Sequence, residues 1–490
     1  MTSLPTSRWR LALESPAVPV GMLLVFATLI VLTITRFGTW IDESATLALV
    51  GRHDYGDILR LMDLDVHPPL WYLLLKPWLQ LFGSTVVVAR TQSAVFMLIA
   101  AGIWYHFVKT RFSRPVALLA LALMVTNPTI LHYAIEGRMY AMGVMLVGLS
   151  CLALTSTWHR HWIAYWLVCV VMLYTHYFLG LVIAGQFVYL FLRRKEEGKL
   201  SLMWIAILGI AIIAAFVPWL PHATHSTKAV QGGFWIPPVQ PSTVTNYVLG
   251  AFLHRMDREL DGARVFPALA FLMIWAGSLV RATRVGTRPT ALLWCIAGIP
   301  WVFLFVLSVK PFVPIFSARY VVFGLPALIT LLAVGALDFV GRWRAVAIAG
   351  LISGQLAGIQ HLRWKGYEEV RGWYSMKTVA ADVRVPVGGE IPTVVATSLF
   401  SYLDAWATLN EDQRLLYLPE DGRNPDMFPE VLFYDLPNIR IASLAEVHDR
   451  HVWILENSFK APTEVPPNWK PSTVHLRGYV RVRLFNLVDP

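Results

Sequence analysis

Charged residues are scarce in this chain of 490 residues. Asp, Glu, Lys and Arg together make up 15% of it, whereas hydrophobic residues make up 56%. Because soluble domains carry roughly a quarter charged residues, this composition excludes an ordinary soluble enzyme. The chain is therefore predicted to be an integral membrane protein, with the lipid bilayer among its partners.

Cysteine is rare as well, with three residues in the chain. Cys151, Cys169 and Cys295 all fall within apolar runs, so none is available to form a disulfide in an external segment. Basic runs interleaved with aromatic residues, which a groove for single-stranded nucleic acid needs, are also missing. The net charge of +10 therefore predicts no nucleic-acid partner, because basic loops beside anionic lipid explain most of it.

Long apolar runs are what the sequence does contain. A helix needs about 20 residues to cross a hydrocarbon core of about 30 Å. Suitable runs lie at 18–36, 86–108, 115–133, 139–157, 162–175, 177–193, 202–220, 265–281, 290–309, 319–340 and 344–361. The fifth and sixth are short and meet at Thr175-His176-Tyr177, so they can also form one broken pair. The sequence predicts about eleven transmembrane helices.

The distribution of Lys and Arg predicts the orientation, because short basic loops stay on the cytoplasmic side. With the N-terminus inside, all five inner connections are basic: Lys109-Arg111-Arg114, His159-Arg160-His161, Arg193-Arg194-Lys195, Arg281-Arg284-Arg288 and Arg342-Arg344. The segment after Leu362 then lies outside. The prediction is a multi-pass protein of a bacterial cytoplasmic membrane with its functional residues on the extracytoplasmic face.

The segment after Leu362 has the character of a soluble domain. Strand-like runs lie at 393–397, 414–418, 451–455 and 479–484, and helical spacing occurs at 368–383 and 399–409. A Gly-rich phosphate loop of the standard patterns is missing there. We predict a transmembrane domain at 1–362 and a C-terminal external α/β domain at 363–490.

Four polar groups at predicted outer span ends are candidates for chemistry. They are Asp42-Glu43, Glu136 with Arg138 and Tyr140, His176, and Arg319-Tyr320. Each has a structural alternative: acidic pairs mark membrane boundaries, exposed ion pairs are worth at most about 1 kcal/mol, and a lone His often bonds between helices. Together, however, they supply carboxylates and cations on one side of the membrane.

Carboxylates and cations on one side suit transfer from a phosphate-linked donor. A carboxylate takes the proton of an acceptor hydroxyl, and Arg, Lys or His neutralises the departing phosphate. Since phosphate is already a good leaving group, no general acid is needed.

Several short motifs carry a family resemblance. They are Trp40-Ile41-Asp42-Glu43-Ser44, His67-Pro68-Pro69-Leu70-Trp71-Tyr72, Leu81-Phe82-Gly83-Ser84 with Arg90, Glu136-Gly137-Arg138-Met139-Tyr140-Ala141, Tyr174-Thr175-His176-Tyr177-Phe178 and Arg319-Tyr320. Over about 38–330 the chain resembles bacterial GT-C glycosyltransferases related to protein O-mannosyltransferases, with its most specific match in the first loop. The external domain contributes no motif to this resemblance.

The resemblance implies a fold, an activity and roles for individual residues. The fold is a polytopic α-helical GT-C membrane protein, and the activity is inverting sugar transfer from a polyprenyl-phosphate donor to a cell-wall glycan, glycolipid or protein outside the membrane. Asp42 is the implied base, with Glu43 as the second candidate. The donor phosphate is assigned to Glu136, Arg138, Tyr140, His176, Arg319 and Tyr320, and the acceptor or its loop to Asp65 and His67.

Two other classes of function stay open at this stage. A transporter or flippase of a lipid-linked sugar would favour internal repeats and charges at mid-membrane, whereas the charges here lie at outer span ends. A scaffold would leave the clustered carboxylates and cations unexplained. No cofactor is predicted with certainty: standard His/Cys metal spacings are missing, but carboxylates such as Asp42 leave a divalent cation, Mg or Mn, open.

Overall fold

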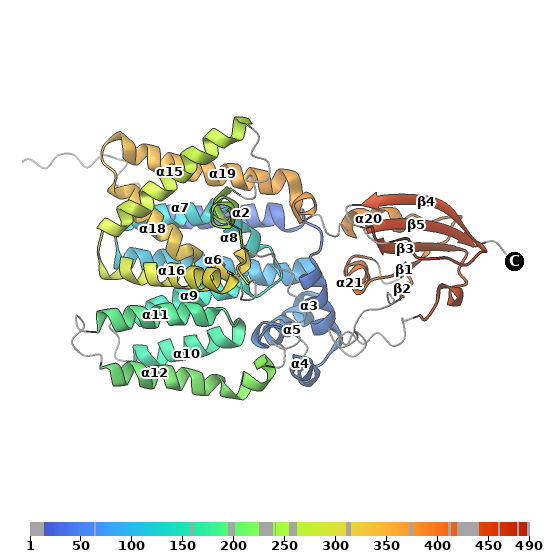
Figure 1. The fold of residues 1–490 in the computed structure, drawn as a ribbon, viewed down its shortest axis with the longest axis horizontal. Helices are drawn as coiled ribbons and strands as arrows, with labels where there is room; N and C mark the ends of the chain where they lie inside the picture. Colours follow the sequence, from blue (N-terminus) through green and yellow to red (C-terminus); the bar gives the residue numbers. More distant parts are fainter. Residues whose placement is uncertain are drawn as a thin grey trace, which may run out of the picture. The chain divides into compact units, whose positions relative to one another are not determined.

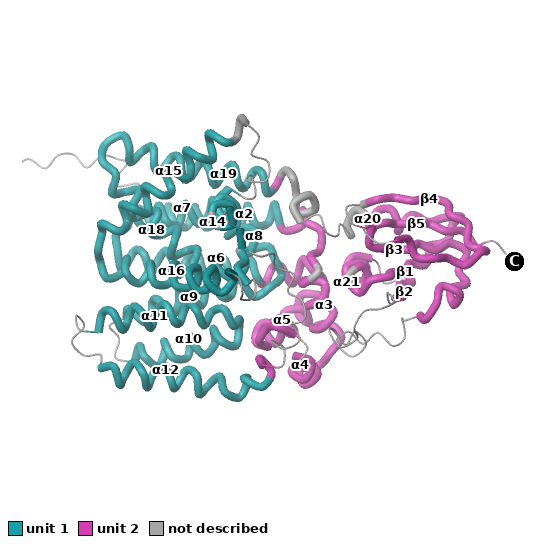
Figure 2. Tube along the Cα trace, in the orientation of Figure 1, with its two compact units in different colours: residues 1–33, 93–221, 233–362 teal, residues 34–92, 222–232, 363–490 magenta. Residues whose placement is uncertain are grey.

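The computed structural model describes residues 14–62, 65–156, 160–194, 201–224, 239–240, 242–253, 262–309, 315–371, 376–409, 413–418, 441–458, 461–477 and 480–487. Of the residues named in the sequence analysis, His159, Lys195 and Tyr479 lie outside these ranges. The contacts divide the chain into two compact units (Figure 2). Unit 1 comprises 1–33, 93–221 and 233–362, and unit 2 comprises 34–92, 222–232 and 363–490.

The described part of unit 1 is helical (Figure 1). Its helices are α2 (Ala17–Ile34), α6 (Val86–Arg111), α7 (Arg114–Val125), α8 (Pro128–Ala134), α9 (Tyr140–Leu154), α10 (His161–Thr175), α11 (Leu179–Arg193), α12 (Leu202–Phe216) with η1 (Val217–Trp219), α14 (Thr243–Leu253), α15 (Gly262–Arg284), α16 (Arg288–Ser308), α17 (Ala318–Val321) with η3 (Val322–Gly324), α18 (Leu325–Asp338) and α19 (Arg342–Arg371). The first residues of α6 (86–92) and the last residues of α19 (363–371) belong to unit 2. The protein is a multi-pass membrane protein of the helical class that the sequence predicts.

The apolar runs of the sequence form these helices. Within the described residues, seven helices are long and apolar enough to cross a membrane, and α7 with α8 forms an eighth span if the bent pair is one. The helices α9, α10 and α11 are apolar but shorter, at 15 residues each. The predicted count of eleven spans therefore stays a prediction.

The bend between α7 and α8 has a local cause. The two helices meet at 65°, where Pro128 follows Asn127 and disfavours a helical conformation for it. The Asn127 side chain caps α8 by accepting hydrogen bonds from the amides of Thr129 (3.0 Å) and Ile130 (2.9 Å). The short α8 then ends at Ala134, and the turn that follows carries two of the candidate site residues, Glu136 and Arg138.

Two glycines allow close helix crossings in unit 1. A Cβ on Gly335 of α18 would lie 1.7 Å from the carbonyl oxygen of Ser278 in α15, and one on Gly185 of α11 would lie 2.5 Å from that of Cys295 in α16. Small residues commonly permit such backbone approach between membrane helices. These two contacts fix the separations of α15 from α18 and of α11 from α16.

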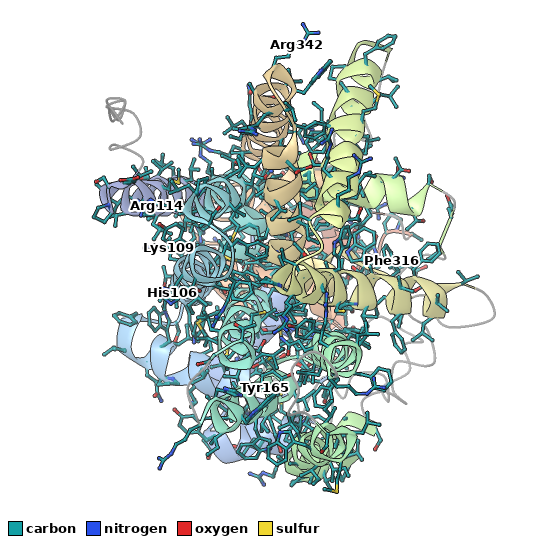
Figure 3. All side chains as sticks on the ribbon, turned by 90° about the vertical axis from the view of Figure 1, so that its left-hand side faces the viewer. His106, Lys109, Arg114, Tyr165, Phe316 and Arg342 are labelled. Carbon is teal, nitrogen blue, oxygen red and sulfur yellow. The ribbon has the colours of Figure 1, made fainter. Side chains whose placement is uncertain are left out.

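Basic residues gather at one end of unit 1. Figure 3 looks onto this end and shows Lys109 at the close of α6, Arg114 at the start of α7 and Arg342 at the start of α19. They belong to two of the predicted inner connections, Lys109-Arg111-Arg114 and Arg342-Arg344. Three separate helix ends of the same sign on one end of the unit are consistent with a cytoplasmic face.

Unit 2 combines the segment 34–92 with the C-terminal domain. The segment forms α3 (Ile41–Arg52), α4 (Tyr55–Leu61) and α5 (Leu70–Phe82), and the domain contains α20 (Met376–Val383), β1 (Thr393–Ala396), α21 (Leu399–Thr408), β2 (Leu415–Tyr417), η4 (Leu444–Glu446), β3 (His451–Asn457), β4 (Trp469–Arg477) and β5 (Val480–Leu487). The predicted α/β character of the domain is thereby confirmed.

The five strands form one mixed sheet in the order β2-β1-β3-β5-β4. The strand β1 pairs in parallel with β2 and β3, whereas β5 pairs antiparallel with β3 and β4. Val395, Ile454, Trp469 and Phe485 share an apolar cluster with residues around η4. Helix α21 packs against β1, β2 and β3. The burial of all four residues of β1 fits a central strand that is covered on both faces.

Two features of the C-terminal domain differ from the sequence-based prediction. The strand β4 was not predicted, because Pro466 and Pro467 lie just before it and Pro471 lies within it. It forms at the sheet edge, where proline is tolerated, with an irregularity after Pro471. The helix expected at 368–383 is divided, since 368–371 continue α19 and α20 begins at Met376.

Candidate active site

The first turn of α3 carries the two adjacent carboxylates. Trp40 precedes the helix in an extended conformation, and its amide donates to Glu43 Oε2 at 3.0 Å. An acidic residue in the first turn is favourable there because the helix dipole places partial positive charge at that end. Glu43 therefore caps the beginning of its own helix.

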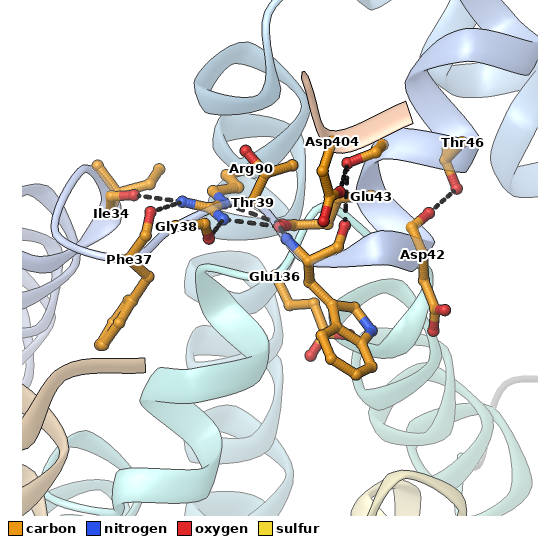
Figure 4. A network of polar contacts seen from close by, with 12 residues as sticks. Ile34, Phe37, Gly38, Thr39, Asp42, Glu43, Thr46, Arg90, Glu136 and Asp404 are labelled. Atoms are coloured by element: carbon orange, nitrogen blue, oxygen red, sulfur yellow. Dashed lines mark hydrogen bonds and ion pairs between the residues drawn. The ribbon is translucent and has the colours of Figure 1, made fainter. Parts of the chain in front are cut away.

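Glu43 is also fully engaged by Arg90. Arg90 Nε lies 2.8 Å from Glu43 Oε1 and Arg90 Nη2 lies 2.6 Å from Oε2, so the ion pair is bidentate. Side-chain exposure is only 4% for Arg90 and 1% for Glu43. The remaining Arg90 hydrogens go to the carbonyls of Ile34 (3.0 Å), Phe37 (3.1 Å) and Gly38 (2.7 Å), as Figure 4 shows. This network ties the start of α3 to α6.

Asp42 is placed differently from its neighbour. Its side chain is half-buried, and Figure 4 shows it pointing away from the pair of Glu43 and Arg90. Its backbone carbonyl accepts from the Thr46 hydroxyl at 2.7 Å. Of the two adjacent carboxylates, Asp42 is the one whose position suits contact with a substrate.

Asp65 and His67 form a second network in the same loop. Asp65 Oδ1 accepts from the backbone amide of His67 at 2.9 Å and lies 2.8 Å from its ring Nδ1. The other oxygen, Oδ2, accepts from the Tyr72 hydroxyl at 2.7 Å. A carboxylate on Nδ1 orients the imidazole ring and fixes its tautomer. The structure thus brings together the two residues that the resemblance assigns to the acceptor or its loop.

In unit 1, the turn between α8 and α9 holds Glu136 and Arg138. Glu136 Oε2 lies 3.1 Å from His132 Nε2, one helical turn earlier. The Arg138 carbonyl accepts from the Ser93 hydroxyl at 3.1 Å, which ties the turn to α6. Both charged side chains are buried, with exposures of 4% for Glu136 and 3% for Arg138. Buried charges of this kind are uncommon and frequently functional.

Tyr140, His176 and Tyr320 meet in an aromatic cluster. The His176 ring centroid lies 5.8 Å from that of Tyr140 and 5.8 Å from that of Tyr320, with Phe323 at 5.1 Å. The His176 Nδ1 accepts from the amide of Phe178 at 3.2 Å. Tyr140 is fully buried, and its hydroxyl has no hydrogen-bond partner among the described residues. It is therefore available as a donor to a bound ligand.

Arg319 completes this group. It lies in α17, directly before Tyr320, and is half-buried. The charges of Arg319, Glu136 and Arg138 all act at the Tyr140 phenol. All six residues assigned to the donor phosphate lie in unit 1, whereas Asp42, Glu43, Asp65 and His67 lie in unit 2.

Sequence reasoning missed two further residues. His132 pairs with Glu136, and the i, i+4 spacing of the two on a helical pattern could have indicated this. Asp404 accepts a hydrogen bond from Ser44; its signal was a lone acidic residue in the apolar run Leu399–Thr408. In the described part of the chain, no group of three or more His, Cys, Asp or Glu could hold a metal ion.

Known proteins match this chain in two ways: a family model matches part of the sequence, and solved structures match the fold. Residues 66–222 match a family model described as dolichyl-phosphate-mannose-protein mannosyltransferase. The crystal structure of ArnT from Cupriavidus metallidurans in the apo state matches with a TM-score of 0.58 and 13% identity, covering 98% of each chain. The same protein bound to undecaprenyl phosphate matches with a TM-score of 0.59, 13% identity and the same coverage.

The predicted resemblance to the protein O-mannosyltransferase-like group of GT-C enzymes is confirmed. The chain shares the fold of ArnT, and its residues 66–222 are similar to the mannosyltransferase family. The oligosaccharyltransferase of Archaeoglobus fulgidus is more distant, with a TM-score of 0.46 and 12% identity over 89% of this chain and 68% of that chain. No curated protein matches the sequence significantly.

Proposed function

We propose that this protein transfers a sugar from a polyprenyl-phosphate donor to a hydroxyl group of an extracytoplasmic acceptor, with inversion and with Asp42 as general base. The observation that carries the proposal is the division between the two carboxylates of α3. Glu43 is held by Arg90 through both oxygens, whereas Asp42 is half-buried and points away from that pair.

The donor class rests on two likenesses. The family model is named for a dolichyl-phosphate mannose donor, and ArnT, whose fold this chain shares, was crystallised with undecaprenyl phosphate. Both compounds are polyprenyl phosphates. The chain's own contribution is the group in unit 1, where Arg138, Arg319 and the Tyr140 hydroxyl offer positive charge and a hydrogen-bond donor to a phosphate.

The chemical step is a single displacement at the anomeric carbon. The acceptor oxygen forms a bond to this carbon while the bond from the carbon to the phosphate oxygen breaks. Asp42 takes the hydroxyl proton, and polyprenyl phosphate leaves with the bonding electron pair. Arg138 and Arg319 stabilise its negative charge, with His176 as a third contributor. One displacement inverts the anomeric configuration.

The membrane side follows from the basic helix ends. Lys109, Arg114 and Arg342 belong to the connections that the positive-inside rule places in the cytoplasm. We therefore propose a bacterial cytoplasmic membrane with the active site on its extracytoplasmic face.

The acceptor is a cell-wall glycan, a glycolipid or a protein. A requirement for Mg or Mn is tested by comparing turnover with and without a chelator.

A turnover assay tests this function. The full chain is reconstituted in lipid vesicles with a radiolabelled polyprenyl-phosphate sugar and a cell-envelope extract as the source of acceptor. We expect label in the acceptor, free polyprenyl phosphate, and an anomeric configuration opposite to that of the donor. Movement of label across the vesicle on an intact donor would instead identify a flippase.

A further inference from the structure

The C-terminal domain packs against the helix that carries the proposed base. Helix α21 lies against α3 within unit 2. The Arg52 guanidinium sits 4.8 Å from the Trp406 ring centroid, and the hydroxyls of Thr39 and Thr408 are 3.5 Å apart. These contacts bracket a central one, in which the Ser44 hydroxyl donates to Asp404 Oδ1.

Asp404 is unusual among the carboxylates of the protein. It has no exposed surface, and its Oδ2 has no hydrogen-bond partner among the described residues. Burial raises the pKa of Asp404 to about 8, although the hydrogen bond from Ser44 lowers it, and the negative charges of Glu43 and Asp42 raise it further. Burial therefore favours the neutral carboxylic acid form of this side chain.

The charges around α21 also favour the neutral form of Asp404. The described titratable side chains on elements packed against α21 are Asp42, Glu43 and Arg52 of α3, Asp382 of α20, Tyr417 of β2, and His451 and Glu456 of β3. The cation Arg52 is directed to Trp406 and to the Tyr402 hydroxyl at 3.5 Å. Glu456 is paired with Arg483. The charges that act on Asp404 from α3 are thus both negative.

We propose that Asp404 is a positioning residue for transfer: through Ser44 it fixes the first turn of α3 in the orientation that presents Asp42 to the acceptor. This inference rests on the proposed function of Asp42. The two residues that follow Asp42 are anchored by different partners, Glu43 by Arg90 of α6 and Ser44 by Asp404 of the C-terminal domain. The external domain then contributes to the chemistry by holding the helix of the base.

Variants at Asp404 and Ser44 separate positioning from general stability. We expect Asp404→Ala to lower kcat by about 10–100-fold, because small displacements of a catalytic group cost rates of this size, and to leave the KM for the donor unchanged. Ser44→Ala should have the same effect, and the double variant should be no slower than the slower single one. Asp449→Asn, which removes a carboxylate paired with Arg414 elsewhere in the domain, is the matched control.

The dependence of kcat on pH distinguishes positioning from a purely structural role, which would not alter this dependence. Ionisation of Asp404 above about pH 8 would place a third negative charge beside Glu43 and Asp42, so wild-type kcat should fall on this alkaline side. Asp404→Asn keeps an acceptor for Ser44 and cannot ionise. It should restore most of the kcat that Asp404→Ala loses and should show no such alkaline fall.

Unchanged kcat in Asp404→Ala, or additive effects of the two single variants, would overturn the proposal. If Asp404→Ala does not fold, Ser44→Ala and the pH profile of Asp404→Asn carry the test. If the wild type transfers no sugar, the proposed function fails separately. Thermal unfolding of the single and double variants then still measures the coupling of Ser44 to Asp404, and zero coupling would overturn the contact itself.

Discussion

At the scale of single residues, Asp42 and Glu43 are adjacent in sequence but have different surroundings. The sequence could identify the pair as catalytic candidates, but it could not assign the base, because this depends on where Arg90 lies. Arg90 is 47 residues away from Glu43. The structure assigns the ion pair to Glu43, and we therefore propose Asp42 alone as the base.

A change in Glu43 should affect folding more than chemistry. Glu43→Gln leaves the Arg90 guanidinium buried without its counter-charge, and breaking a buried ion pair from one side costs about 3–5 kcal/mol. We expect a clear fall in the unfolding temperature, measured in detergent, and the same fall in Arg90→Ala. A Glu43→Gln protein of normal stability with no transfer activity would instead make Glu43 the base.

Arg138 and Arg319 are expected to hold the donor phosphate. Removing either cation should weaken binding of the polyprenyl-phosphate sugar, and Arg→Lys should restore little if the contact is bidentate, because Lys lacks the planar fork of donors. Donor binding to Arg138→Ala and Arg319→Ala measures this. Arg342→Ala is the control, since Arg342 is exposed and begins α19 at the basic end of unit 1. Unaltered donor affinity in both variants would exclude the role.

At the scale of elements, the crossing of α15 and α18 depends on a residue without a side chain. A Cβ at Gly335 would overlap the Ser278 carbonyl, whereas one at Gly298 of α16 meets nothing within 4 Å. We expect Gly335→Ala to lower the unfolding temperature, with a loss of about 1–3 kcal/mol typical of overpacking, and Gly298→Ala to change it little. Equal effects of the two substitutions would contradict the close approach.

Sequence patterns predicted helices and strands best where an element consists of one uninterrupted apolar run. The long apolar runs correspond to helices, and the short apolar runs at 451–455 and 393–397 correspond to β3 and β1. The edge strand β4 was missed because its prolines mask the strand pattern, and a paired partner in β5 stabilises it nonetheless. The bend before α8 was missed as well, although Asn127-Pro128 carries its signal.

At the scale of the whole molecule, the sequence could predict the class of protein but not how its distant segments assemble. Ser44 and Asp404 are 360 residues apart, and neither composition nor periodicity links positions so far apart. The grouping of 34–92 with 363–490 in one unit depends on such contacts. The residues proposed to bind the donor, by contrast, lie at span ends that the sequence already indicated.

The orientation of the whole protein in the membrane can be tested by labelling introduced cysteines. Val474 of β4 is 56% exposed, and Val340, in the basic connection before α19, is 72% exposed. We expect an impermeant thiol reagent to label Val474→Cys in intact cells and Val340→Cys only after permeabilisation, because basic connections stay in the cytoplasm. The opposite pattern would reverse both the proposed orientation and the side of the reaction.

The most direct measurement of the central claim is sugar transfer by Asp42→Asn in the vesicle assay. The amide is nearly isosteric with the carboxylate but cannot take the hydroxyl proton, so the rate should fall by about 10²–10⁴, while the unfolding temperature and donor binding stay as in the wild type. Asp57→Asn, which removes the carboxylate paired with Arg60 in the same loop, should transfer normally. Near-normal transfer by Asp42→Asn would contradict the account.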